Sequence, residues 1–266
     1  MQEIIDFLAW MQANSAAKST IRAYRCDLHQ YSNWCNTANI NILAVDQTVV
    51  IQYIANRSRS YAVSSVARKV ACVSRFYSYL ESKGITTNPF RTKIGPRASH
   101  IRTTRILTDT AITKLLSVIT NPRDRLIILL IINTGIKMGK LITLTVDDWH
   151  PDINALNIHG LPAVMPAEIQ NAINAYLLVR KSTGSNYLFT NKHGDAITDR
   201  SIRRHIDKYA WDSGAGFITP QDLRGYFITN RLRAGVSVRE LQRTLGLRYA
   251  QSVQSYVDWR EANMEI

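Results

Sequence analysis

The sequence has few cysteines and no long apolar run. Its 266 residues include three cysteines, at positions 26, 35 and 72, and none belongs to a Cys-x-x-Cys pair. The odd number, together with a start that lacks the basic region of an export signal, favours reduced thiols. The longest apolar run, Leu126 to Ile132, is much shorter than the roughly 20 residues needed to span a bilayer. We therefore expect a cytoplasmic chain that neither crosses a membrane nor depends on disulfides.

Motifs for bound metals and nucleotides are also missing. No group of histidines and cysteines has the spacing of metal ligands, and neither the P-loop pattern nor the Gly-x-Gly-x-x-Gly pattern occurs. We therefore expect no cofactor.

Positive charge is what the sequence has in excess. Its 33 Lys+Arg outnumber its 20 Asp+Glu, which gives a formal net charge of +13. The surplus is spread along the chain, because residues 1–100 hold 12 basic and 5 acidic side chains and residues 101–266 hold 21 and 15. This distribution favours a long polyanion, duplex DNA first. An RNA, an anionic membrane surface or the mere solubility of a basic protein would also account for the charge.

Periodicity predicts a mainly α fold with a small β element. Apolar residues at helical spacing predict helices in the first 80 residues, and Gly84 ends the last of them. The second half also reads as mostly helical. The exception is a short hairpin of strands 155–158 and 163–165, joined by the four residues from His159 to Pro162.

The stretch between Glu81 and Asp109 contains no acidic residue, six basic ones, two prolines and a glycine near its middle. This composition predicts two domains, 1–88 and 107–266, joined by a basic linker at 89–106 that follows the DNA phosphates. A solvated loop is the alternative.

Four sequence segments resemble the tyrosine recombinase (phage integrase) family. Residues 134–148 (TGIKMGKLITLTVDD) are similar to its first signature box and 219–227 (TPQDLRGYF) to its second. Leu245-Gly246-Leu247 followed by Ser255-Tyr256 has the spacing of the third, and residues 18–28 resemble its helical core-binding domain. The segments occur in the family's order and cover nearly the whole chain.

The resemblance implies a fold and a reaction. The fold would be a helical, SAM-like core-binding domain and a mixed α/β catalytic domain that form a C-shaped clamp around duplex DNA. The reaction would be site-specific strand exchange through a 3′-phosphotyrosyl intermediate, which needs neither metal nor ATP. It would take place in a homotetramer or with a partner recombinase, and it would serve a mobile element.

The resemblance also assigns catalytic positions, of which this sequence keeps few. Tyr256 takes the place of the nucleophile and Arg224 that of the second arginine. Lys137 stands where the family has its first arginine, so the charge remains but the planar fork that grips phosphate is lost. Lys140 replaces the acid that usually follows three residues later.

The proton-donating positions depart further. Gln221 replaces the first histidine and Leu247 the second, and Gly225 follows Arg224 where the family often has histidine. No lysine or arginine lies between His150 and Gln170, so His159 at the predicted hairpin turn is the candidate for the leaving-group acid. Four of six catalytic positions therefore differ from the family pattern.

Further basic residues are candidates for DNA contacts. They lie on the outer face of the predicted helix at 62–81, in the linker, and on the predicted helix at 199–211: Arg68, Lys69, Arg75, Arg97, Arg102, Arg203 and Arg204.

Two functions remain open from the sequence. The first is an active site-specific recombinase that uses Tyr256. The second is a recombinase-shaped DNA-binding protein with impaired chemistry, acting as an accessory, regulatory or architectural factor. Losing one preorganised donor costs about 10²–10³ in rate, so several such losses together could abolish turnover.

The charge distribution predicts tight, salt-sensitive binding of duplex DNA by the whole chain. If six to ten phosphates are contacted, affinity should fall about 10³–10⁵-fold between 50 and 200 mM salt, because each contact releases condensed counterions. A filter-binding titration over this range tests the prediction, and a nearly flat salt dependence would contradict it.

Overall fold

The structure is a computed structural model that describes residues 1–90, 106–181, 184–247, 252–254 and 256–257. The chain divides into two compact units, Met1–His100 and Ile101–Ile266, each described here by itself. The predicted linker at 89–106, with Arg97 and Arg102, lies almost entirely outside the described residues. Its extent and its role on DNA therefore stay predictions.

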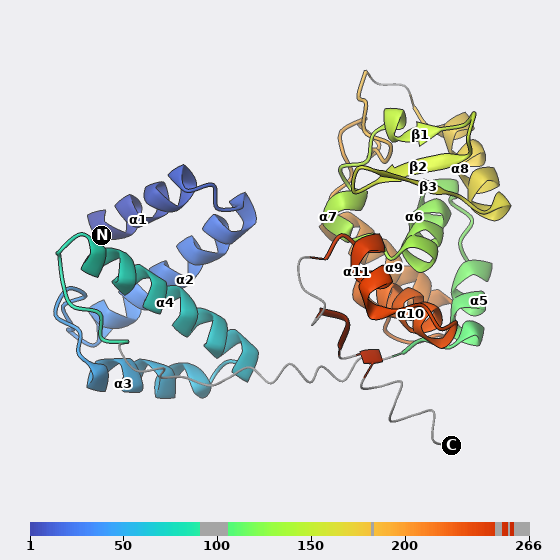
Figure 1. Cartoon of the computed structure of the whole chain (residues 1–266). Helices are drawn as coiled ribbons and strands as arrows, with labels where there is room; N and C mark the ends of the chain where they lie inside the picture. The colour runs from blue at the N-terminus through green and yellow to red at the C-terminus, as the bar shows by residue number, and fades with distance from the viewer. Residues whose placement is uncertain (91–105, 182–183, 248–251, 255, 258–266) are drawn as a thin grey trace. The chain divides into compact units, whose positions relative to one another are not determined.

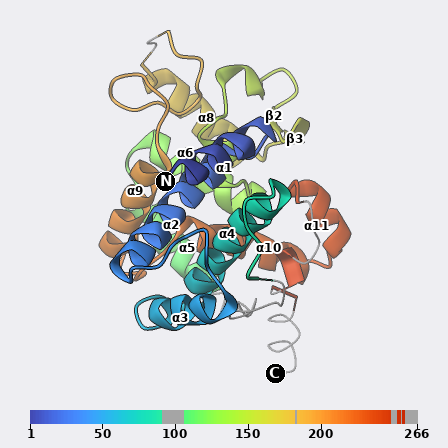
Figure 2. The same ribbon diagram turned by 90° about the vertical axis from the view of Figure 1, so that its left-hand side faces the viewer.

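The described part of the first unit is helical. It comprises α1 (Gln2–Ala13), α2 (Lys18–Thr37), α3 (Gln47–Ser58) and α4 (Val63–Ser82). Helices α1, α2 and α4 pack side by side and α3 contacts α4 (Figures 1 and 2). Their apolar faces meet in a core rich in aromatic rings, in which the buried Tyr31 and Tyr77 hydroxyls lie 2.9 Å apart. The helices predicted in the first 80 residues are confirmed.

Lys69 does not lie on the outer face of α4, so that part of the sequence interpretation is wrong. Its side chain is buried, and its Nζ donates to Asp27 Oδ1 at 2.9 Å and to Gln30 Oε1 at 2.6 Å. Asp27 of α2 is itself buried and also pairs with Arg68, whose side chain is half exposed. A buried carboxylate needs a cation close by, and Lys69 is drawn inward to supply it.

The described part of the second unit is mainly helical with one small sheet, as the sequence predicted. Its helices are, in order, α5 (Asp109–Ser117), α6 (Pro122–Thr134), α7 (Met138–Leu141), α8 (Ala167–Val179), α9 (Asp199–Asp212), α10 (Pro220–Arg233) and α11 (Val238–Thr244), with a 3₁₀ turn at Val146–Asp148. The sheet and α8 lie at one end of the unit, and α10 and α11 lie at the other (Figure 1).

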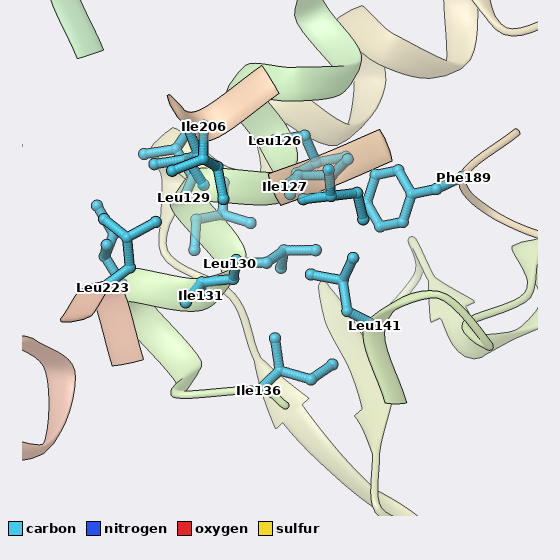
Figure 3. Close-up of a cluster of buried hydrophobic side chains, with 14 of the residues drawn as sticks. Leu126, Ile127, Leu129, Leu130, Ile131, Ile136, Leu141, Phe189, Ile206 and Leu223 are labelled. Atoms are coloured by element: carbon cyan, nitrogen blue, oxygen red, sulfur yellow. The ribbon is translucent and has the colours of Figure 1, made fainter. Parts of the chain in front are cut away.

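Helix α6 is the centre of this unit. Asn121 caps it by accepting hydrogen bonds from two backbone amides of its first turn, and Pro122 occupies its first position. Every residue from Leu126 to Ile132 is buried, because α8 and α10 pack against different faces of the helix. Figure 3 shows several of these side chains meeting Leu141, Phe189, Ile206 and Leu223 from other segments. The apolar run that is too short to span a bilayer is thus a buried core helix.

The hairpin is tighter than the sequence predicted. Strands β1 (Trp149–His150), β2 (Ala155–Ile158) and β3 (Leu161–Val164) form an antiparallel sheet in the order β1-β2-β3. The connection between β2 and β3 is the pair His159-Gly160, both with positive φ (57° and 79°), as in a type I′ turn. Leu161 and Pro162 belong to β3 and not to the connection. Proline is tolerated there because β3 is an edge strand of this sheet, where a missing N–H need not be paired.

In the described ranges, no helix is both long enough and apolar enough to cross a membrane.

Replacing Asp27 by alanine should strongly destabilise the first unit. The change leaves the Lys69 ammonium buried without its carboxylate, which typically costs about 3–5 kcal/mol. The loss in the free energy of unfolding is measured by urea titration, with hydrogen exchange of the α2 and α4 amides as the probe of the first unit. The double variant Asp27→Ala/Lys69→Met is the control, and it should recover most of the stability because neither charge remains. A single variant as stable as the wild type would contradict the buried pair.

Candidate active site

A pocket of about 390 Å³ in the second unit collects residues that are distant in the sequence. Its wall is built from the segment after α6, from the beginnings of α9 and α10, and from the segments after α11. Four of the five predicted catalytic residues line it: Lys137, Gln221, Arg224 and Tyr256.

The start of α10 places two of these residues. Thr219 and Asp222 form a capping box, in which the Asp222 carboxylate accepts from the Thr219 amide at 2.8 Å and the Thr219 hydroxyl accepts from the Asp222 amide. Pro220 fills the first helical position, where no backbone N–H is needed. The helix therefore begins at a fixed residue, and Gln221 and Arg224 both face the pocket from its first turns.

Arg224 is a buried cation. Its side chain is 6% exposed, and burial lowers its pKa from the ordinary value while the nearby Tyr256 opposes that shift. Among the residues that the structure describes, its Nη1 has no hydrogen-bond partner. A buried charged donor without a partner is costly, and an anion in the pocket would supply both the countercharge and the acceptor.

A close approach of two segments brings Lys137 to the pocket. Gly135 ends α6 in the left-handed conformation (φ 62°), and a Cβ at this position would lie 2.5 Å from the Phe227 ring and 2.6 Å from Leu245. Only glycine fits so close to α10 and α11. The chain then turns into Lys137, the N-cap residue of α7, whose pKa is lowered by partial burial and by the Arg224 charge.

Packing and a hydrogen bond from Gln221 hold Tyr256 at the pocket. It is 4% exposed and belongs to a small apolar cluster with Phe227, Leu241 and Val253. Its hydroxyl oxygen accepts a hydrogen bond from Gln221 Nε2 at 3.0 Å. The cluster fixes the ring and the amide fixes the oxygen, so the hydroxyl has a defined place beside the Arg224 guanidinium.

His159 reaches the same group of charges from the hairpin turn. A Cβ on Gly246 would lie 3.0 Å from its ring, so the histidine packs against the segment that follows α11. Burial lowers its pKa below the ordinary 6.5, and Arg224, Lys140 and Lys137 lower it further in that order. His159 is therefore mostly neutral at pH 7. It interacts electrostatically with Arg224 and Lys137, which also line the pocket.

The structure separates the other predicted residues. Arg203 lines the pocket, whereas its neighbour Arg204 is exposed and does not. Arg68 and Arg75 lie in the first unit with exposed side chains, as expected of the outer face of α4. Leu247, at the position of the family's second histidine, also lines the pocket and adds an apolar wall where a donor would stand.

Two polar residues of the pocket wall, Asp199 and Ser252, were not predicted from the sequence. Asp199, at the start of α9, lies in the pocket wall and pairs with Arg203, and Ser252 contributes a hydroxyl. The Asp-x-x-x-Arg spacing of the first pair was a usable signal, because residues four apart share a helix face.

The pocket has the character of an anion site beside a nucleophile. Three cationic side chains and one carboxylate line it, next to the tyrosine hydroxyl. Within the described ranges, no group of three histidine, cysteine or acidic side chains could hold a metal ion. The arrangement can bind a phosphate group and present an oxygen nucleophile to it.

Two family profiles match most of the chain. The profile described as "Phage integrase family" matches residues 105–263, and the one described as "Phage integrase, N-terminal SAM-like domain" matches residues 4–84.

Curated relatives match over most of their length. A tyrosine recombinase of Agathobacter rectalis is 30% identical over 86% of this chain and 82% of its own. The tyrosine recombinase XerC of Herpetosiphon aurantiacus is 28% identical over 96% of this chain and 90% of its own.

Solved structures share the fold. XerH site-specific recombinase, bound to palindromic difH substrate in a post-cleavage complex, has a TM-score of 0.78 at 15% identity, over 95% of this chain and 80% of its own. A lambda integrase dimer bound to a COC′ core site has a TM-score of 0.75 at 13% identity, over 96% of this chain and 94% of its own.

Proposed function

The chain belongs to the phage integrase family of tyrosine recombinases, and we propose that it performs site-specific strand exchange on duplex DNA with Tyr256 as the nucleophile. One observation supports the proposal: a single cationic pocket holds both Arg224 and the Tyr256 hydroxyl. Arg224 is buried and its Nη1 has no hydrogen-bond partner among the described residues, and a hydrogen bond from Gln221 holds the hydroxyl. The assembly is a homo-oligomer on DNA or a complex with a partner recombinase. The element it serves is a mobile one.

In this reaction Tyr256 Oη attacks a phosphodiester phosphorus. The hydroxyl releases its proton to solvent as the 3′-phosphotyrosyl bond forms, and the bond from phosphorus to the 5′-oxygen breaks. The departing 5′-oxygen takes up a proton, so the step consumes no net proton. Bond energy is conserved, so the step can be reversed by the 5′-hydroxyl of another strand. Arg224 and Lys137 stabilise the negative charge that grows on the phosphate oxygens. Gln221 holds the nucleophilic oxygen in place but cannot carry a proton.

His159 is the residue of this site best suited to protonate the leaving oxygen. The family position for this task falls on the hairpin, and His159 lies at its turn with a pKa that responds to Arg224, Lys140 and Lys137. A phosphate bound among these cations would offset their charge and raise the pKa of the ring toward working pH. The acid would then become protonated once the substrate is in place.

The second candidate function is a recombinase-shaped DNA-binding protein without cleavage. Two residues of the pocket wall support it, because Leu247 removes a donor from the site and Lys137 has no planar fork with which to grip phosphate. Both candidates bind duplex DNA, so covalent chemistry is what separates them.

The decisive test is covalent capture on DNA that the protein itself selects. Full-length protein enriches duplexes from a random pool, and nicked versions of the enriched sequence trap any phosphotyrosyl adduct for a denaturing gel. Wild type should form an adduct. Tyr256→Phe should abolish it with binding close to wild type, because only the hydroxyl is lost. Arg224→Ala should slow adduct formation about 10²–10³-fold, as for the loss of one preorganised donor.

The controls decide between the candidates. An adduct that persists in Tyr256→Phe would place the nucleophile elsewhere. If wild type forms no adduct while Lys137→Arg combined with Gln221→His and Leu247→His does, the protein is the impaired binder. These three changes restore the family pattern.

The role of His159 predicts a pH dependence. Adduct formation should accelerate as the pH falls from 8 toward 6, because the protonated fraction of the ring increases, and His159→Ala should lose this dependence. A substrate with sulfur in place of the bridging 5′-oxygen needs no acid, so it should restore the rate of His159→Ala. His150→Ala, which removes an exposed histidine of the same sheet, is the control and should behave like wild type. An unchanged pH profile in His159→Ala would assign the proton to another group.

A further inference from the structure

The pocket contains a second guanidinium that the family pattern does not account for. Arg203 of α9 lines it together with Arg224, Lys137 and Tyr256, whereas the adjacent Arg204 does not. From the sequence alone these two arginines are equivalent exposed cations. In the structure, only one of them is part of the wall that surrounds the nucleophile.

Arg203 is held by a carboxylate in the same wall. Its Nε lies 2.7 Å from Asp199 Oδ1, and its Nη2 donates to Asp199 Oδ2 at 3.3 Å. The ion pair and the hydrogen bond thus both involve the edge of the guanidinium that carries Nε and Nη2. Both side chains are about half exposed, at 50% for Arg203 and 45% for Asp199, so the pair fixes the plane of the fork without burying it.

The pocket has a use for such a fork. Lys137 brings charge to the site, but an ammonium is a point charge that cannot grip two phosphate oxygens in a planar, bidentate way. A guanidinium can, and two guanidinium groups on one phosphate hold it by several oriented hydrogen bonds. Arg224 supplies one fork from α10, and Arg203 is the other arginine in the pocket wall.

We propose that Arg203 is a phosphate ligand of this pocket and supplies the second guanidinium that position 137 lacks. The inference rests on the proposed function in one respect, because it takes the phosphate of a DNA phosphodiester as the ligand. Arg204, on the same helix, has no such role.

The first test is the rate of adduct formation on the selected nicked duplex. Arg203→Ala should slow it about 10²-fold, on the scale of a lost preorganised donor. The matched control Arg200→Ala removes an exposed arginine of the same helix that does not line the pocket, and it should stay within a few-fold of wild type. Lys137→Arg should restore most of the rate in the Arg203→Ala background, because it returns a fork to the site. Equal rates for Arg203→Ala and Arg200→Ala would overturn the proposal.

The second test needs no cleavage. In the Tyr256→Phe background, duplexes that each carry one neutral methylphosphonate are scanned for binding. One phosphate should contact Arg224 in the pocket. Its neutralisation should weaken the binding of Tyr256→Phe and should have no effect on the double variant Tyr256→Phe/Arg224→Ala, which identifies it as the pocket phosphate. Neutralising that phosphate should cost about tenfold or more in affinity, the scale of a charged hydrogen bond. The cost should shrink in Arg203→Ala and persist in Arg200→Ala.

The two tests separate the failures. If wild type forms no adduct but the methylphosphonate cost depends on Arg203, strand exchange is wrong and the phosphate contact stands. If wild type forms an adduct and the cost is independent of Arg203, the proposed function stands and the contact is wrong.

Discussion

Desolvation of one guanidinium is the constraint around which the second unit is arranged. Moving a cation out of water is expensive unless an anion or a set of acceptors replaces the lost hydration. Arg224 is 6% exposed, yet its Nη1 has no acceptor among the described side chains. A phosphate oxygen bound in the pocket would supply this acceptor. Such a site selects compact anions, because a neutral ligand would leave the same charge uncompensated.

The positions of the residues around Arg224 depend on close contacts between segments that are far apart in the sequence. The helix that carries it starts at a residue fixed by the Thr219 capping box, and its Phe227 ring leaves no room for a Cβ on Gly135. The close contact between Phe227 and Gly135 places Lys137 at the pocket. The apolar cluster that includes Phe227, Leu241 and Val253 holds the ring of Tyr256. Interiors are packed as densely as crystals, so a displacement at one of these contacts would move several site residues together.

The local sequence predicted most helices, the small sheet and the positions of the site residues in their motifs. It did not predict the contacts between elements. Motif spacing placed Lys137, Gln221, Arg224 and Tyr256 at matching positions, and all four line one pocket. Lys69 could not be placed in this way, because its burial depends on a carboxylate 42 positions away on another helix. The same limit applies to the adjacent Arg203 and Arg204 of α9, because only the arrangement of the neighbouring segments decides which of them lines the pocket. The predicted hairpin connection was too long for a different reason: the prediction assigns Leu161 and Pro162 to the connection, whereas both belong to the edge strand β3.

The turn of the β2–β3 hairpin has a consequence for how the site can change over generations. His159 holds a left-handed backbone conformation (φ 57°), which costs most L-residues roughly 1–2 kcal/mol and asparagine less. Asparagine at this position would relax the backbone and make the hairpin more stable. Selection for stability alone would therefore remove the histidine, whereas selection for proton transfer would keep it. The residue found at this turn in a variant population reports which of the two pressures has acted.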